Sequence, residues 1–541
     1  MTDATEMTSA PTFEMVAKTF QGLEDVLAEE LRSLGARNVE PGTRMVSFEG
    51  DLATLYRANL CCRTALRILK PFYKFRASDP DELYERIKEY DWGTLLNLEK
   101  TFSIDTVAFG EEFTHTRFAT YRVKDGIVDW FRDRFGADCR PKVRLENADV
   151  ILNVHIHGTD VTVSLDSSGE SLHKRGYRLG GQTEAPINEV LAAGIILKSG
   201  YRGDVPFVDP MCGSGTFLVE AALIAANIFP GVFRQHYAFE TWPDFDRELF
   251  EELYNDDSAE RTPEFPIVGA DISPKAVAIA RENVKGAGVG QYVSVEIRPV
   301  SQWEEAPQPA GILVTNPPYG QRISAPDMEA LYQTIGQKLK HVFTGYHAWI
   351  IGYKDEYFRE IGLAPSQKMA VNNGGLDCEL REYVIFEGSK RDFRAAGGTI
   401  KEERPDSPSE RRKASDKRDR KPFDRGRKGG DREHKSFGRD RKPFDRERKP
   451  FDREHKPFDK DRKPFDRDRK RFDRESQGEE RAPRHFGLAD TEGLAEKPRR
   501  KLRLDRFGRG PQISADKEEI VNRPSARGWR RKKQDYSTPE E

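Results

Sequence analysis

The sequence predicts an α/β protein with a doubly wound, mostly parallel sheet over residues 167–388, preceded by α+β blocks and followed by a basic, disordered tail. Three observations support this prediction. Short apolar runs alternate with helical patterns from Phe13 onward, and a glycine loop joins an apolar run to a helical pattern within residues 206–223. The charge also divides unevenly along the chain.

The charge distribution separates a body from a tail. Of the 541 residues, 33% are charged, which is too polar for one uniformly folded body. Residues 389–541 hold 49 Lys and Arg against 33 Asp and Glu, so they carry a net charge of +16, while residues 1–388 carry −18. This asymmetry indicates a globular body with a basic interaction tail.

Cysteine usage and the N-terminus indicate the compartment. The five cysteines form no CxxC pair, so neither a disulfide framework nor a zinc site is expected. Residues 1–12 begin acidic, lack an apolar h-region and are expected to be disordered, and the chain has no run of about 18 apolar residues. We therefore expect a cytoplasmic protein without a membrane partner or a bound metal.

Two α+β blocks open the chain. Residues 13–75 follow the order strand, helix, strand, helix, strand, and residues 76–166 begin with helix, strand, helix. The helices are recognised by apolar spacings of three and four. In chain order, the expected elements are 13–18, 23–31, 44–48, 52–60, 65–75, 81–89, 101–108 and 121–131.

A hairpin closes the second block. Residues 150–157 and 160–165 alternate apolar and polar side chains, and the Gly-Thr pair between them is a two-residue turn signal. His155 and His157 share one strand face and could be read as metal ligands. Because no third ligand lies nearby, we interpret them as surface or packing residues.

The segments after this hairpin carry a family resemblance. Ser171 to Arg178 reads SLHKRGYR, and Ala185 to Glu189 reads APINE. With the preceding block, they resemble a THUMP domain that follows a ferredoxin-like piece and leads into the methyltransferase domain of bacterial large-subunit (23S) rRNA guanine-N2 methyltransferases. The resemblance covers about residues 13–388.

This resemblance implies a domain order and a substrate class. It implies a ferredoxin-like region at 13–75, a THUMP RNA-binding domain at 76–166 and a Rossmann-like class I methyltransferase at 167–388. THUMP domains are associated with RNA modification, so the resemblance also implies ribosomal RNA (23S) or large-subunit precursor particles as partners.

The glycine loop is the expected cofactor site. S-adenosylmethionine needs a strand-end acid, close backbone approach at its amino-acid part and a second acid for its ribose hydroxyls. Asp209, the Gly213-Ser214-Gly215 turn and Asp271 fit these roles. The turn also opens a helical pattern, which places backbone N–H groups at a helix N-terminus. The expected cofactor-binding residues are Asp209, Pro210, Met211, Cys212, Gly213, Gly215, Thr216, Asp271 and Gln302.

A nicotinamide-binding loop is the competing interpretation. In a dinucleotide fingerprint the third glycine is present and the acid follows about 20 residues later. Here the third glycine is absent, and Asp271 lies 56 residues after Gly215 because of a long insertion at 227–265. We therefore favour the methyltransferase interpretation.

One expected acid is missing. The family commonly has an acid after its third strand to contact the adenine amine, but here residues 292–297 lead into Arg-Pro-Val-Ser-Gln. We expect adenine recognition to fall to the backbone around Val300 or to the side-chain amide of Gln302.

The motif Asn316-Pro317-Pro318-Tyr319 follows a buried-type apolar run and is the expected catalytic site. A base amine is a poor nucleophile because its lone pair is delocalised into the ring. If the Asn316 side-chain oxygen and the Pro317 carbonyl accept hydrogen bonds from the two N–H groups of this amine, its nitrogen is favoured in a pyramidal form. The prolines hold both acceptors in place. Tyr319 can stack on the extruded base, and no general base is required.

Several alternatives stay open. The motif could be only a turn, although it follows a glycine loop and a strand-end acid in the order found in amino-group methyltransferases. It does not separate guanine N2 from adenine N6 or glutamine N5; the family resemblance, including Asn373 to Cys378, favours guanine N2. A DNA adenine methyltransferase would need a target-recognition domain, which the N-terminal blocks do not resemble. A non-catalytic RNA-binding protein would not need Asp209, Asn316 and Tyr319, all of which are present.

The tail repeats a heptapeptide typified by Arg441 to Glu447, RKPFDRE. Most units carry a proline and a single apolar residue, which excludes a coiled coil and indicates disorder over residues 389–541. Interleaved Arg, Lys and Phe could bind RNA through phosphate contacts and stacking, or the tail could be a solvated linker. We favour RNA contact because a body of −18 needs a way to approach a polyanion.

Overall fold

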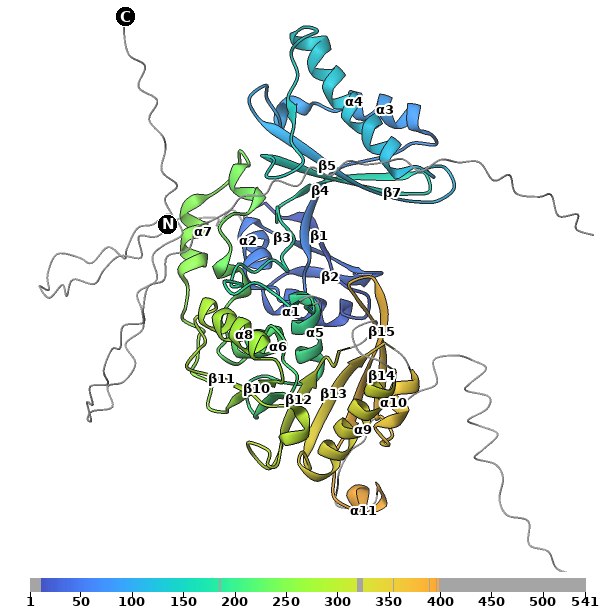
Figure 1. The fold of residues 1–541 in the computed structure, drawn as a ribbon. Helices are drawn as coiled ribbons and strands as arrows, with labels where there is room; N and C mark the ends of the chain where they lie inside the picture. The colour runs from blue at the N-terminus through green and yellow to red at the C-terminus, as the bar shows by residue number, and fades with distance from the viewer. Residues whose placement is uncertain are drawn as a thin grey trace, which may run out of the picture. The chain divides into compact units, whose positions relative to one another are not determined.

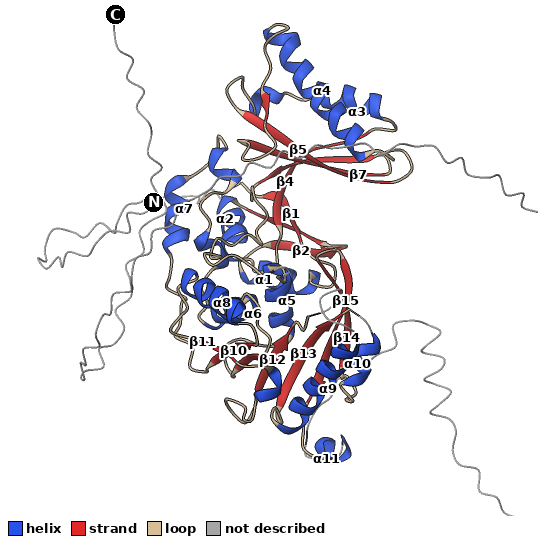
Figure 2. Ribbon diagram, in the orientation of Figure 1, coloured by secondary structure: helices blue, strands red, loops and turns tan. Residues whose placement is uncertain are grey.

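The computed structural model describes residues 11–183, 186–318, 325–353, 355–388, 390–395 and 397. Within them the strands form two sheets, drawn in red in Figure 2. The first has the order β2-β3-β1-β4-β8-β7-β5-β6 and the second the order β11-β10-β9-β12-β13-β15-β14. No helix in this part of the chain is long and apolar enough to cross a membrane.

The first block supplies half of the eight-stranded sheet. All five expected elements are confirmed, but a strand that the sequence did not predict, β2, pairs with β3 at the sheet edge. Its side chains are almost all exposed, so it shows no apolar alternation, and it contains a proline, which edge strands tolerate. The elements are β1 (Phe13–Lys18), α1 (Glu24–Ser33), β2 (Arg37–Gly42), β3 (Met45–Gly50), α2 (Leu52–Cys61) and β4 (Arg67–Arg76).

The second block continues the same sheet. β4 pairs with β8 from Leu69 opposite Asp166 to Arg76 opposite Asp160, so one sheet spans both expected N-terminal regions. The predicted hairpin is confirmed, with Gly158 at a φ of +58° in its turn, and Figure 1 shows α3 and α4 on one face of the sheet. The elements are α3 (Pro80–Glu89), η1 (Trp92–Thr94), β5 (Thr101–Phe109), α4 (Thr116–Phe135), β6 (Lys142–Val143), β7 (Val150–His157) and β8 (Asp160–Asp166).

The half of the body that begins at residue 167 is doubly wound, as predicted. Strands β11, β10, β9, β12 and β13 are parallel, and β15 and β14 add an antiparallel edge. The chain runs outward from β9 to β11 and then returns to β12 on the other side of β9, so the strand order reverses between β9 and β12. Open α/β sheets bind ligands outside the carboxyl ends of their strands at such a reversal.

The elements of this half are α5 (Glu189–Lys198), β9 (Phe207–Asp209), α6 (Thr216–Ala225), η2 (Pro230–Phe233), η3 (Ala238–Thr241), α7 (Arg247–Asn255), β10 (Ile267–Asp271), α8 (Pro274–Gly286), β11 (Val293–Ile297), η4 (Val300–Gln302), β12 (Gly311–Thr315), α9 (Ala325–His341), β13 (Tyr346–Gly352), α10 (Asp355–Glu360), β14 (Gln367–Asn373), β15 (Leu376–Val384) and α11 (Lys390–Ala395). The helix α11 lies at the start of residues 389–541, the range assigned to the tail from the sequence. Its Phe393 stacks on Phe386, with ring centroids 4.5 Å apart.

The insertion at 227–265 packs on the N-terminal block. Its aromatic residues share a core with β1 and α2, and Tyr56 of α2 lies 4.6 Å from Phe239 and 5.4 Å from Phe250, measured between ring centroids. Arg234 donates to four backbone carbonyls within residues 168–174, the segment between the two sheets. The insertion therefore connects the first block to the doubly wound half.

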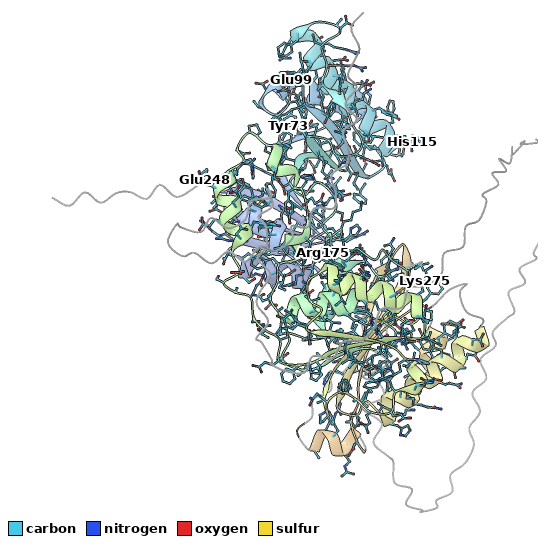
Figure 3. All side chains as sticks on the ribbon, turned by 60° about the vertical axis from the view of Figure 1, so that its left-hand side comes forward. Tyr73, Glu99, His115, Arg175, Glu248 and Lys275 are labelled. Carbon is cyan, nitrogen blue, oxygen red and sulfur yellow. The ribbon has the colours of Figure 1, made fainter. Side chains whose placement is uncertain are left out.

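A buried ion pair lies in the same region. Arg175, labelled in Figure 3, has its Nε 3.4 Å from Glu220 Oε1 and donates to the carbonyls of Leu172 and Arg63. Both side chains of the pair are almost completely buried. Since either charge would be costly to bury alone, each requires the other in the folded chain.

Candidate active site

A cavity of about 1280 Å³ contains residues that follow the carboxyl ends of β9, β10 and β12. Its position is the one expected from the reversal of strand order. The cavity is lined by Thr183, Pro186, Ile187, Asp209, Met211, Cys212, Gly213, Ser214, Thr216, Phe217, Asp271, Ile272, Ser273, Ala276, Pro299, Val300, Ser301, Asn316, Pro317, Pro318, Asp327, Leu331, Thr334, Tyr353, Tyr357 and Leu376.

The glycine loop joins β9 to α6 beside this cavity. Gly213 and Gly215 have φ values of +53° and +78°, in the left-handed region that favours glycine. A Cβ on Gly215 would lie 3.0 Å from the Cβ of Ala280, so Gly215 permits close packing on α8. The nearest atom to a Cβ on Gly213 would be Thr183 Oγ1 at 3.7 Å, which leaves its backbone accessible to a ligand.

Asp209 ends β9 in a buried position. Its Oδ1 accepts from Thr315 Oγ1 at 2.8 Å and from the Met211 N–H at 3.2 Å. Burial raises the pKa of Asp209 to about 7, and the nearby charge of Asp271 acts in the same direction. Pro210, the next residue, is buried and is not among the described residues that line the cavity.

Asp271 ends β10 and connects to the glycine loop. Its Oδ2 accepts from the Gly213 N–H at 2.9 Å, and its Oδ1 accepts from the Ser273 N–H at 2.8 Å. Ile272 lines the cavity beside it and is 70% exposed. The sequence interpretation missed Ile272, although an apolar residue directly after a strand-end acid was the available signal.

The segment after β11 borders the cavity through its backbone turn. Pro299, Val300 and Ser301 line the cavity, whereas Gln302 is exposed and is not among its described lining residues. The Gln302 N–H donates to the Pro299 carbonyl at 3.0 Å, within η4. Of the two positions expected to recognise adenine, Val300 therefore lines the cavity, and Gln302 is not among the described residues that line it.

Asn316, Pro317 and Pro318 enter the cavity directly after β12. The Asn316 Oδ1 atom is buried and has no hydrogen-bond partner in the described part of the chain. A buried acceptor left unpaired is costly, so this oxygen is suited to receive a donor from a ligand. Tyr319, the fourth residue of the expected motif, lies outside the described residues.

The other side of the cavity was not predicted. It is lined by residues of α9 and α10, by Tyr353 after β13 and by Leu376 at the start of β15. Tyr353 and Leu376 are 41% and 43% exposed. Residues so far apart in sequence give no common signal, because only the sheet order brings them together. The cavity volume exceeds the roughly 300–1,000 Å³ typical of a pocket for one small ligand.

Comparisons with family models match three consecutive regions. Residues 14–69 match the RlmL ferredoxin-like domain, residues 77–166 the THUMP domain, and residues 175–382 the RMKL-like methyltransferase domain.

Individual proteins of similar sequence are described as RNA methyltransferases. The chain is 38% identical over 397 residues to "Putative RNA methyltransferase slr0064" of Synechocystis sp., with 71% of this chain and 99% of that protein covered. It is 39% identical over 380 residues to "Ribosomal RNA large subunit methyltransferase K/L" of Syntrophotalea carbinolica, with 68% of this chain and 53% of that protein covered. The chain thus spans about half the length of the K/L relatives.

Solved structures share the fold. The crystal structure of SMU.472, described as "a putative methyltransferase complexed with SAH", is 31% identical with a TM-score of 0.62, and 70% of this chain and 99% of that chain are covered. A structure described as "a predicted N6-adenine-specific DNA methylase" from Listeria monocytogenes is 30% identical with a TM-score of 0.62, with 69% and 97% covered.

The fold and the cavity define an S-adenosylmethionine-dependent methyltransferase of class I. The glycine loop fits this cofactor because its backbone at Gly213 is open to the cavity. More narrowly, the chain belongs to the family of THUMP-containing methyltransferases with an RlmL-type ferredoxin-like domain and an RMKL-like catalytic domain.

Proposed function

We propose that this protein methylates an exocyclic base amine of RNA, and that its target is guanine N2 in 23S rRNA or in large-subunit precursor particles. The names of the relatives and the THUMP domain support an RNA substrate. The guanine target rests on the family resemblance. Such a protein would act in the cytoplasm, with residues 13–75, 76–166 and 167–388 as its ferredoxin-like, THUMP and methyltransferase regions.

The observation that carries the proposal is the buried Asn316 Oδ1 without a hydrogen-bond partner among the described residues. In the proposed complex this oxygen and the Pro317 carbonyl accept hydrogen bonds from the two N–H groups of the amine. The nitrogen is then favoured in a pyramidal form with its lone pair available. Pro318 limits movement of this segment, and Tyr319 stacks on the base.

The cofactor roles follow from the other end of the cavity. When bound, S-adenosylmethionine supplies the electrophilic methyl group. We assign its amino-acid part to Asp209 and to the loop of Met211, Cys212, Gly213 and Thr216, with Pro210 and Gly215 shaping that loop. We assign its ribose hydroxyls to Asp271, and we retain Gln302 as the side-chain alternative for adenine.

Adenine N6 is the second candidate. The 30% identical Listeria structure is described as an N6-adenine-specific DNA methylase, and adenine presents a planar amine as guanine does. Asn316 and Pro317 would recognise the amino group, and they do not by themselves distinguish the two bases.

Product analysis separates these proposals. Total RNA from a strain lacking the gene is incubated with the protein and tritiated S-adenosylmethionine, and the labelled nucleosides are identified. We expect N2-methylguanosine. N6-methyladenosine would replace the guanine assignment, and transfer that is equal in the wild type and in Asn316→Ala would refute catalysis at this site.

A further inference from the structure

Arg178 joins the segment before α5 to the glycine loop. Its Nε donates to Glu189 Oε1 at 2.5 Å, one terminal nitrogen to Ser214 Oγ at 3.2 Å and the other to Thr216 Oγ1 at 2.9 Å. Glu189 is the first residue of α5, while Ser214 and Thr216 flank the start of α6. One guanidinium group therefore fixes two residues of the loop against a neighbouring helix.

Asn283 of α8 forms a second connection to the same loop. Its Nδ2 donates to the Ser214 carbonyl at 3.0 Å and to the Gly181 carbonyl at 3.1 Å, and its Oδ1 accepts from the Gly180 N–H at 3.1 Å. The side chain is completely buried. Asn283 thus holds Ser214 through its carbonyl, whereas Arg178 contacts its hydroxyl, and it also fixes the segment that follows Arg178.

Neither Arg178 nor Asn283 is among the described residues that line the cavity. The residues they hold, Ser214 and Thr216, do line it, and Gly213 beside them donates to Asp271. We propose that Arg178, paired with Glu189, and Asn283 are positioning residues that hold the cofactor loop in its binding geometry. This inference rests on the cofactor assignment of the proposed function.

The choice of side chain supports positioning over simple stabilisation. A cation near the start of a helix is disfavoured by the helix dipole, and a partly buried one needs a carboxylate partner. Arg178 sits at the start of α6 with Glu189 as that partner. An arginine provides several donors at fixed angles on one planar group, which a lysine ammonium does not.

The test compares Arg178→Lys with Arg261→Lys. Arg261 is a matched control because it donates to the Ala225 carbonyl at the opposite end of the same helix, α6. For Arg178→Lys we expect the Kd for S-adenosylhomocysteine, measured by calorimetry, to rise about tenfold or more. The KM for S-adenosylmethionine should rise similarly, while the KM for RNA and the kcat at saturating cofactor stay near wild type.

For Arg261→Lys we expect an unchanged Kd. An unchanged Kd in Arg178→Lys, or equal changes in both variants, would overturn the inference. If Arg178→Lys does not fold, Glu189→Gln keeps the arginine and removes its charged partner. A raised Kd is again expected, and a wild-type Kd would again overturn it. Because binding is measured without RNA, it is independent of the proposed base: altered binding with no RNA methylation would refute the function and leave the positioning role standing.

Discussion

Asp209 is a single residue that links the two ends of the candidate site, the glycine loop and the motif that begins at Asn316. The Thr315 hydroxyl donates to it, and Thr315 directly precedes Asn316, the residue proposed to accept from the base amine. The sequence predicted a strand-end acid here, but not its partner or its raised pKa. The partner and the raised pKa both follow from the pairing of β9 with β12, which buries this carboxyl beside Thr315. Local sequence does not specify that pairing.

The raised pKa predicts a pH-dependent cofactor affinity. A pKa raised from 3.8 to about 7 means that folding favours the neutral carboxyl; this stability is present below pH 3.8 and is lost as pH rises through 7. The groups nearby are the Asp271 carboxylate and the Cys212 thiol, neither of which supplies a positive charge. The ammonium group of a bound cofactor would stabilise the charged carboxylate, so binding should release a proton.

We expect the affinity for S-adenosylhomocysteine to fall by up to about tenfold for each unit below pH 7. Calorimetry in buffers of different ionisation enthalpy measures both the affinity and the released proton. Asp209→Asn should bind more weakly than wild type at pH 8 and should show no such pH dependence. Wild-type affinity that is constant from pH 6 to pH 8 would contradict the assignment.

Among the helices and strands, those with a strong local sequence pattern were the ones that could be predicted. The glycine loop, the strand before Asp271 and the 150–165 hairpin were predicted because each combines an apolar run with a characteristic turn or end residue. The strand β2 was missed because pairing with β3, rather than its own pattern, forms it. The insertion at 227–265 was noted only as a spacer, since its aromatic residues contact partners that are distant in sequence.

Phe250 tests whether this insertion is a structural part of the body. It is fully buried, with its ring 5.4 Å from Tyr56 and 5.2 Å from Phe239 between centroids. Phe250→Ala should destabilise the protein by about 3–5 kcal/mol, as for other buried phenylalanines. Thermal denaturation should show a large loss of stability for this variant and a clearly smaller one for Phe265→Ala, because Phe265 is 36% exposed. Equal melting temperatures would mean that the insertion is not packed as described.

At the scale of the whole molecule, the unequal charge of body and tail is the main feature that the fold does not account for. Residues 1–388 carry −18 and residues 389–541 carry +16, so the body that we propose to act on RNA is acidic overall. The fold class and the order of the regions could be predicted from motifs and from family resemblance. The cavity could not, because it combines side chains from β9, α9, β15 and the segment after β12, which only the sheet order brings together.

Deletion of residues 389–541 should therefore weaken RNA binding most at low salt. Lysine and arginine side chains that contact phosphates displace counterions from the RNA. Deleting the side chains of the tail should therefore make the plot of log affinity against log salt concentration less steep. Filter binding or fluorescence anisotropy over about 50–300 mM salt measures this slope. An affinity equal to that of the full chain at every salt concentration would show that the tail does not contact RNA.

Methyl transfer by Asn316→Ala tests the proposed catalytic site most directly. We expect N2-methylguanosine in 23S rRNA with the wild-type protein, and a loss of about hundredfold or more in methyl transfer with the variant, comparable to removing one oriented transition-state hydrogen bond. Binding of S-adenosylhomocysteine should stay near wild type, and Asn255→Ala, at an exposed position on α7, should remain fully active. Full activity of Asn316→Ala with intact cofactor binding would show that Asn316 is not a catalytic residue.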